Sequence, residues 1–252
     1  MELIDSHCHL DFARIGDLDC VLAQSNESGI NQFVVPSVDK QNWRDVLRLA
    51  KNYRSIHAAL GVHPYFISAD NELEQLQRLL ISQRDHIVAV GEIGLDGAIE
   101  SSLEQQLAVF VPQLKMACEL ELPVICHAHK AYDPLLKQLR LYRPNAGGVI
   151  HGFSGSLVQA NEFIKLGFKL GIGGVITYER AKKTRLVISQ IALEHLVLET
   201  DSPDMPVFGQ QGHSNSPKHI LTIAKCLANI TSNSLADVAD MTTNNAQTLF
   251  NL

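Results

Sequence analysis

The sequence predicts an α/β fold, a TIM (β/α)8 barrel, and three observations support this prediction. Short apolar runs rich in β-branched residues alternate with amphipathic stretches, which is typical of parallel strands joined by helices. Eight such runs can be counted, and that number favours a closed barrel over an open sheet. Six potential metal ligands follow these runs, as expected at the mouth of a barrel. The length of 252 residues suits one barrel, so we expect a single domain over residues 1–252.

The expected strands are short and mostly apolar. They cover residues 2–6, 32–36, 56–61, 87–92, 123–126, 148–151, 169–173 and 196–199. A helical pattern follows each strand, and the clearest cover residues 42–51, 73–84, 103–120, 159–166 and 181–191. Two further helices are expected at residues 217–230 and 234–249, after a loop at 202–216 that is long enough to act as a rim or lid.

Composition excludes several classes of protein. The hydrophobic content of 46% supports one large core, and no stretch approaches the ~20 apolar residues of a membrane span. The N-terminus has no basic start and no long apolar segment, so we expect no signal peptide and a cytoplasmic protein. A net charge of −6 argues against non-specific binding of nucleic acid by a basic surface, although bound metal ions can still attract a phosphate. No obligate protein partner is evident.

The five cysteines show no CxxC pair, which argues against a zinc knuckle or a redox motif. Cys20, Cys118 and Cys226 lie in helix-like stretches, and Cys8 and Cys126 lie in strand-like ones. We expect buried, reduced thiols.

The segment His7-Cys8-His9 is the first candidate for metal binding. In a strand, residues two apart point to the same side, so both imidazoles would reach one ion while Cys8 points away. Asp5 and Ser6 before them are either acceptors for the ligands or turn residues.

Three further candidates end the central strands. Glu92 follows a run that is otherwise apolar, and a carboxylate is costly to bury there unless it is paired or bound to metal. His127 and His151 end the next two strands. A single histidine at such a point is more often a hydrogen-bonded core residue, but its recurrence in consecutive strands favours a metal site.

Asp201, at the tip of the last strand, is expected to face His7 and His9 because a closed barrel makes the first and last strands neighbours. Six groups are too many for one tetrahedral ion and suit two ions that share a carboxylate. Mixed imidazole and carboxylate ligands favour Zn²⁺, Mn²⁺ or Co²⁺ over Mg²⁺.

Four residues are candidates for substrate binding. His63, at the end of the third strand, would contact a substrate phosphate or protonate a leaving group, or else cap a loop. His129 and Lys130 follow the fifth strand. The basic run at 179–185, with Arg180, lies where barrels commonly bind phosphate, but a solvated helix start fits it as well.

Six motifs, in order and over nearly the whole chain, resemble those of the TatD family of metal-dependent hydrolases, which are amidohydrolase-like barrels. They are DSHCH at 5–9, GVHP at 61–64, GEIGLD at 91–96, PVICH at 123–127, HGFSG at 151–155 and ETDSP at 199–203. GIGG at 171–174, Thr177-Tyr178 and DSPDMP at 201–206 look most like the YjjV branch of that family.

The resemblance implies two divalent ions bridged by Glu92. The first would be held by His7, His9, Glu92 and Asp201, and the second by Glu92, His127 and His151. The family is described as metal-dependent deoxyribonucleases, with 3′–5′ exonuclease activity in some members, so DNA or a nucleotide phosphodiester is the expected substrate. Hydrolysis of D-aminoacyl-tRNA esters has also been attributed to relatives.

The expected mechanism is that of a two-metal hydrolase. The ions would acidify a water and stabilise developing charge, while Asp201 orients that water and takes its proton. Two departures from the family weaken the transfer of DNase activity. His129 stands where many members have an arginine, and the segment 97–100 is short and lacks their aromatic and basic residues.

Two other functions therefore stay open. The same metal chemistry would hydrolyse an amide, a lactone or an aminoacyl ester, and the pocket would decide among them. A metal-binding module without catalysis is the remaining alternative, and the full set of ligands argues against it.

Overall fold

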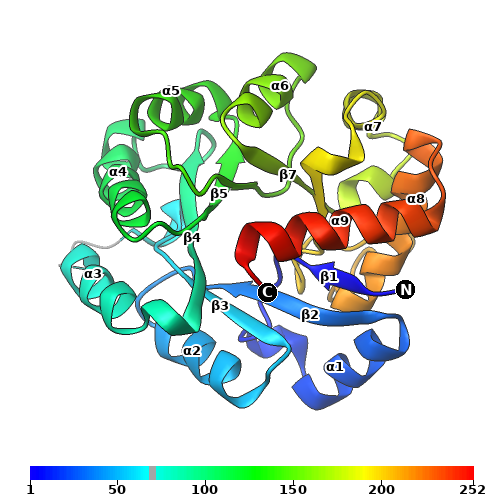
Figure 1. The fold of residues 1–252 in the computed structure, drawn as a ribbon, viewed down its shortest axis with the longest axis horizontal. Helices are drawn as coiled ribbons and strands as arrows, with labels where there is room; N and C mark the ends of the chain where they lie inside the picture. The colour runs from blue at the N-terminus through cyan, green and yellow to red at the C-terminus, as the bar shows by residue number, and fades with distance from the viewer. Residues whose placement is uncertain (68–71) are drawn as a thin grey trace.

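The computed structural model describes residues 1–67 and 72–252, and these form an eight-stranded parallel sheet in the order β1 to β8. Helices surround the strands (Figure 1), which confirms the predicted TIM (β/α)8 barrel. All eight expected strands are present, as β1 Leu3–Asp5, β2 Ile30–Pro36, β3 Ile56–Leu60, β4 Ile87–Asp96, β5 Val124–His129, β6 Gly148–Ile150, β7 Phe168–Ile172 and β8 Leu196–Leu198.

The seam between β8 and β1 is joined by backbone hydrogen bonds. The Ser6 N–H donates to the Leu198 carbonyl at 2.9 Å, and the Asp201 N–H donates to the His7 carbonyl at 2.9 Å. The Asp5 carboxylate accepts from the Thr200 N–H at 3.0 Å and from the Thr200 hydroxyl at 2.5 Å. Asp5 therefore ties the first strand to the segment after the last one, and it also accepts from the His7 N–H at 3.3 Å.

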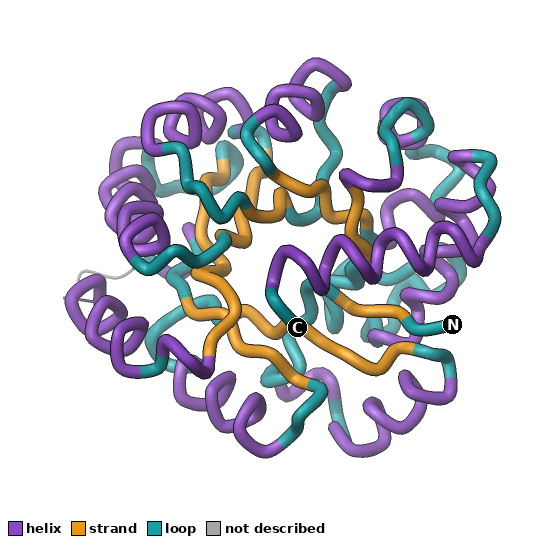
Figure 2. Tube along the Cα trace, in the orientation of Figure 1, coloured by secondary structure: helices purple, strands orange, loops and turns teal. Residues whose placement is uncertain are grey.

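The helices form an outer layer around the strands (Figure 2). They are α1 Leu18–Glu27, α2 Trp43–Asn52, α3 Glu72–Ser82, α4 Leu103–Glu119, α5 Tyr132–Tyr142, α6 Leu157–Lys165, α7 Lys182–Ile188, α8 Ile220–Thr231 and α9 Leu235–Phe250. All the expected helical segments are found, although α7 is shorter than expected and residues 217–219 form a 3₁₀ turn before α8.

Two of these helices begin where the sequence provides a capping box. The Ser102 hydroxyl accepts from the Gln105 N–H at the start of α4, and the Gln105 side chain accepts in return from the Ser102 N–H. Ser156 and Gln159 repeat the arrangement at α6. These contacts satisfy N–H groups that lack partners within the helix, which fixes where each helix begins.

The interior of the barrel is apolar toward the amino ends of the strands. One buried residue from nearly every strand meets the end of α9 there, which crosses that opening in Figure 1. The layer consists of Ile4, Val34, Ala59, Ala89, Ile125, Val149 and Val197, and α9 adds Ala246 and Phe250. The helix is held by its polar side chains, because Asn245 donates to the carbonyls of Leu193 and Leu196. This end of the barrel is therefore closed by packing.

Two strands run several residues past their expected ends. β4 continues past Glu92 to Asp96, and β5 continues past Cys126 to His129. The register between them shifts between Val90 and Ile93, where β4 contains one extra residue. A bulge changes the direction of a side chain within a continuing strand. Glu92 lies between Val90 and Ile93, so the bulge affects the direction of its side chain. β1 ends at Asp5, so His7 and His9 lie in the following loop and not in the strand that was expected to place them on the same side.

The structure also shows the state of the cysteines and the character of the helices. All five cysteines are free, but only Cys8 and Cys126 are buried, while Cys20 is exposed. The prediction that all five are buried is therefore wrong. Among the described residues, no helix has the length and apolar character needed to cross a membrane.

Candidate metal centre

The polar side chains of the centre continue the interior face of the strands. Residues two apart share a face, so His127 lies above Ile125, His151 above Val149 and Glu199 above Val197. β7 contributes space instead of a side chain. A Cβ at Gly171 would overlap the Glu199 carboxylate, so only glycine leaves room for that group.

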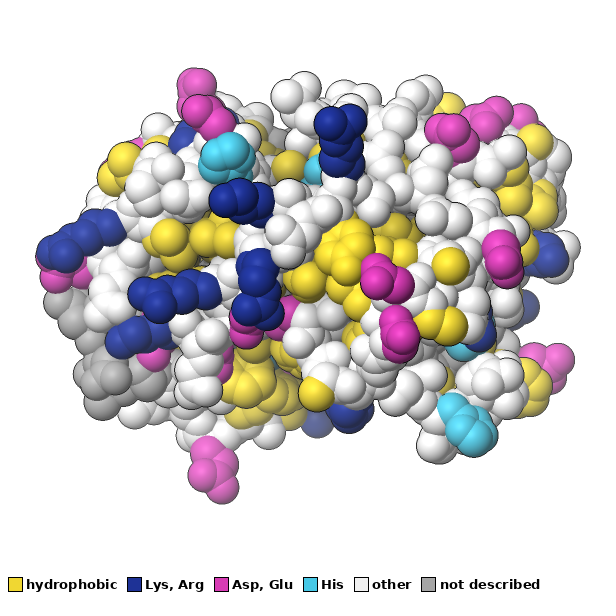
Figure 3. Space-filling view, turned by 90° about the horizontal axis from the view of Figure 1, so that it is seen from below, with side chains coloured by type: hydrophobic (Ala, Val, Ile, Leu, Met, Phe, Trp, Pro, Cys, Tyr) yellow, Lys and Arg dark blue, Asp and Glu magenta, His cyan; other side chains and the backbone are white. Residues whose placement is uncertain are grey.

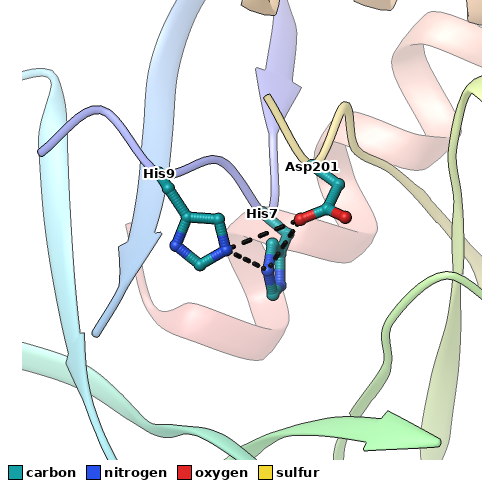
Figure 4. Close-up of side chains that lie close together, drawn as sticks. All are labelled: His7, His9 and Asp201. Atoms are coloured by element: carbon teal, nitrogen blue, oxygen red, sulfur yellow. Dashed lines mark hydrogen bonds and ion pairs between the residues drawn. The ribbon is translucent and has the colours of Figure 1, made fainter. Parts of the chain in front are cut away.

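One group of potential metal-ligand atoms lies around Glu92 Oε2. His7 Nε2 lies 3.3 Å from that oxygen and His9 Nε2 lies 3.8 Å from it. The two imidazole nitrogens are 3.3 Å apart, and each is 3.5 Å from Asp201 Oδ1. Figure 4 shows His7, His9 and Asp201 pointing toward one another from the segments that follow β1 and β8. The expectation that Asp201 faces both histidines matches this arrangement.

A second group meets the other oxygen of the same carboxylate. Glu92 Oε1 lies 3.3 Å from His127 Nδ1, 3.5 Å from His151 Nε2 and 3.4 Å from His63 Nε2. Three imidazoles therefore surround this oxygen, where the sequence predicted two ligands.

These spacings suit cations. Ligand atoms held about 2.1 Å from a tetrahedral ion are about 3.4 Å from one another. The first group, His7, His9, Glu92 and Asp201, has N···N and N···O distances of 3.3 to 3.8 Å. Imidazole nitrogens and carboxylate oxygens form the ligand set that Zn²⁺ and Mn²⁺ accept. The first group therefore fits a divalent ion, and His127 and His151 are further candidate ligands at the other oxygen of Glu92.

The outer nitrogen of three imidazoles faces an acceptor. His9 Nδ1 lies 3.2 Å from the Pro36 carbonyl, His127 Nε2 lies 2.9 Å from Asp96 Oδ2, and His151 Nδ1 lies 3.1 Å from Glu199 Oε1. Each acceptor requires a proton on that nitrogen, so the inner nitrogen has a free lone pair whenever the ring is neutral. This is the tautomer that binds metal, and the acceptors also fix the ring orientation.

His63 is the opposite case. Its Nδ1 accepts a hydrogen bond from the Tyr65 N–H at 3.1 Å, so a neutral ring carries its proton on Nε2. That Nε2–H points at Glu92 Oε1. A protonated nitrogen has no lone pair for a cation, so His63 is arranged as a hydrogen-bond donor beside the second group and not as a ligand.

Electrostatics at the centre favour an ionised Glu92 and a site that attracts positive charge. Burial alone would raise the pKa of Glu92, but His63, His7 and His151 outweigh burial and hold it well below its usual range. Burial lowers the pKa of His151, yet Glu199 and the other nearby carboxylates prevail and raise it to about 10.

The two groups lie at the floor of a cavity of about 680 Å³. His63 and His129 line this cavity, whereas Lys130 and Arg180 do not. His129 is anchored by Asp96, whose two oxygens are both 3.2 Å from its Nδ1. Arg180 instead stacks over the Tyr178 ring at 4.9 Å.

Two residues of the centre were not predicted. Asp96 and Glu199 are buried and hydrogen-bond to His127 and His151, but no role was predicted for either carboxylate. The rule that drew attention to Glu92 and Asp201, a carboxylate at the end of an apolar strand, applies to both of them as well.

Comparisons with known proteins agree with a metal centre at this position. A family model described as TatD related DNase matches residues 4–251. The metal-dependent hydrolase YjjV of Escherichia coli strain K12 is 42% identical over 253 residues, which cover 99% of this chain and 98% of YjjV. A metal-dependent hydrolase of Haemophilus influenzae is 36% identical over 261 residues, covering 99% of this chain and 100% of that protein.

The crystal structure of Escherichia coli YjjV matches with a TM-score of 0.95 and covers 99% of this chain and 98% of that chain, at 42% identity. A TatD family hydrolase of Entamoeba histolytica shares the fold with a TM-score of 0.87 at 21% identity, covering 99% and 98% of the two chains. The chain belongs to the TatD family of metal-dependent hydrolases.

Proposed function

We propose that this protein hydrolyses phosphodiester bonds in DNA, as a 3′–5′ exonuclease, with two divalent cations bound on either side of Glu92. The observation that carries the proposal is the division of one carboxylate between two groups. Glu92 Oε2 faces His7 and His9, while Oε1 faces His127 and His151. A buried carboxylate shared in this way suits a bridge between two ions.

The ligands that we propose are the six that the sequence suggested. The first ion would be held by His7, His9, Glu92 and Asp201, and the second by Glu92, His127 and His151. When bound, the two cations would supply Lewis-acid polarisation of the substrate and a hydroxide-like nucleophile at neutral pH.

Asp201 is the proposed proton acceptor. Its side chain is 21% exposed, against 4% for Glu92, and it lines the cavity where a water would enter. Burial would raise its pKa, but the surrounding imidazoles, His151 foremost, outweigh burial and lower that pKa. An ionised carboxylate within reach of the attacking water can orient it and accept its proton.

His63 is the proposed proton donor. Its Nε2–H is directed into the centre, and the backbone of Tyr65 fixes that tautomer. A leaving oxygen that displaces the contact with Glu92 would meet this N–H.

The family description, TatD related DNase, supports a nucleic-acid substrate. One observation favours a second candidate, a non-phosphate ester or amide such as a D-aminoacyl-tRNA ester. No lysine or arginine is found among the described residues that line the cavity, so additional phosphates would meet no fixed cation there. We place phosphodiester hydrolysis first because the cations themselves would neutralise the scissile phosphate.

Incubation of the metal-loaded protein with single-stranded DNA labelled at its 5′ end tests the proposal. We expect stepwise shortening from the 3′ end, and no shortening with the Asp201→Asn variant. Cleavage of aminoacyl esters with no attack on DNA would replace the proposal by the second candidate. Bound metal with no hydrolysis of either class would instead indicate a binding module.

A further inference from the structure

We propose that the cavity recognises its substrate by stacking a terminal nucleobase against aromatic side chains, and not by gripping the phosphate backbone. This inference rests on the proposed function, because it concerns the substrate of the same site. It assigns Phe66 and the adjacent Tyr65 as the residues that determine specificity.

The walls of the cavity above the metal centre are apolar. Phe12, Tyr65, Phe66, Phe153 and Met205 line it, each from a loop that follows a strand. Three of these side chains are unusually exposed for their size, with 54% exposure for Tyr65, 43% for Phe66 and 46% for Met205. Large apolar side chains left open around a concave site are typical of ligand-binding surfaces.

The aromatic rings lie next to histidines of the metal centre. Phe12 stacks on His9, with centroids 4.7 Å apart and planes 13° apart. Phe66 lies 6.0 Å from His63, and Tyr65 lies 5.9 Å from His127. A flat group held against Tyr65 or Phe66 would therefore have its attached phosphate within reach of Glu92 and its neighbours.

A cluster of lysine and arginine side chains lies in another part of the molecule. Lys and Arg side chains cluster over α2 on the left half of the face drawn in Figure 3. There Arg44, Arg48, Lys51 and Arg54 line a separate hollow beside the amino ends of β3 and β4. The catalytic cavity opens at the carboxyl ends of the strands, and its described lining contains neither lysine nor arginine.

Because the basic side chains lie away from the aromatic cavity, we expect recognition by stacking of a base and not by contacts with several phosphates. Proteins that neutralise several phosphates bind nucleic acid with a steep dependence on salt, because counterions are released. Stacking on an aromatic ring is tolerant of sequence and contributes on the order of tenfold in affinity per base. A cavity lined by rings, without fixed cations, suits a single base at a chain end.

Isothermal titration with two matched ligands tests the inference. Thymidine 5′-monophosphate and deoxyribose 5-phosphate carry the same phosphate monoester, and only the first has a base. With the cation-loaded protein we expect thymidine monophosphate to bind about tenfold more tightly. Equal affinities for the two ligands would overturn the inference.

Phe66→Leu keeps an apolar side chain but removes the flat ring. We expect the advantage of the base to fall to roughly twofold or less in this variant, since stacking on that ring is lost. Phe208→Leu is the matched control, because Phe208 is a 66% exposed phenyl group that does not line the cavity. An advantage that survives in Phe66→Leu, or that is lost equally in Phe208→Leu, would contradict the assignment.

Salt provides an independent readout. The preference for the base should stay within about twofold between 50 and 500 mM KCl, since stacking releases no counterions. A preference that disappears over this range would contradict recognition by stacking. These binding measurements do not depend on turnover, so failure of DNA hydrolysis would remove the proposed function while the titrations still decide whether the pocket selects a base.

Discussion

The two ends of the barrel use the same strands for different purposes. Toward the amino ends the interior holds Ile125 and Val149, and Phe250 of α9 packs over that layer. Two residues further along the same strands, His127 and His151 meet Glu92. The comparison shows that residues only two positions apart on one face of a strand can have different roles. The first stabilises the fold and the second is arranged for chemistry, as is general for this architecture.

The largest effect should come from the carboxyl end. Asp201→Asn removes the proposed proton acceptor but keeps the shape of the side chain, so we expect turnover to fall by on the order of 10²–10⁴. Thermal unfolding of the metal-free protein should change little. Rates measured with the metal-loaded variant check this, and near wild-type turnover would remove Asp201 from the role.

A substitution at the amino end of the barrel should lower stability and leave metal binding unchanged. Phe250 is 2% exposed, and Phe250→Ala leaves a cavity under α9. We expect a loss of about 3–5 kcal/mol in the free energy of unfolding, measured with urea, and unchanged metal affinity of the folded protein. Met241→Ala on the same helix is the matched control, since Met241 is 40% exposed and should cost less than about 0.5 kcal/mol. A large fall in metal affinity in Phe250→Ala would show that the two ends are coupled.

A smaller effect is expected from the residues that hold the ligands. Glu199→Gln replaces the acceptor of His151 Nδ1–H, so the ring loses its fixed orientation and its charge partner. Affinity for one ion should fall about 10–100-fold while the other is retained, measured by competition with a chelator. Asp96→Asn, at His127, is the parallel variant, and wild-type affinities in both would refute the roles of these carboxylates.

The smallest effect is a dependence on pH. In the metal-free protein, the carboxylates Glu199, Glu92 and Asp201 outweigh burial and raise the pKa of His151 to about 10. His151 is therefore protonated at neutral pH, and a cation must displace that proton. Metal affinity should rise with pH, by up to about tenfold per pH unit for each proton released below that pKa. Titration calorimetry in buffers of different ionisation enthalpy measures the release, and no proton release at pH 7 would contradict it.

The sequence predicted the strands and their parallel order because alternation of apolar runs and helices is a local pattern. It did not predict the true ends of β4 and β5, because the bulge that places Glu92 in the centre depends on how β4 pairs with β5. Nor did it show that β1 ends at Asp5, since the residues that follow continue an extended-looking pattern.

At the site, the sequence indicated the residue types that come together but not their partners. The rule of polar residues at strand ends drew attention to His127 and Glu92, whose atoms lie 3.3 Å apart. The tautomer of His63 could not be predicted, because it is set by the Tyr65 N–H in a short 3₁₀ turn. The aromatic lining of the cavity, Phe12, Tyr65, Phe66 and Phe153, was also missed, since these residues come from loops far apart in the sequence.

Anomalous diffraction from crystals soaked in Mn²⁺ tests the central claim most directly. Two peaks should flank the Glu92 carboxylate, one bound by His7, His9 and Asp201 and the other by His127 and His151. A single peak, or peaks beyond the reach of Glu92, would contradict the shared carboxylate on which the proposed chemistry depends.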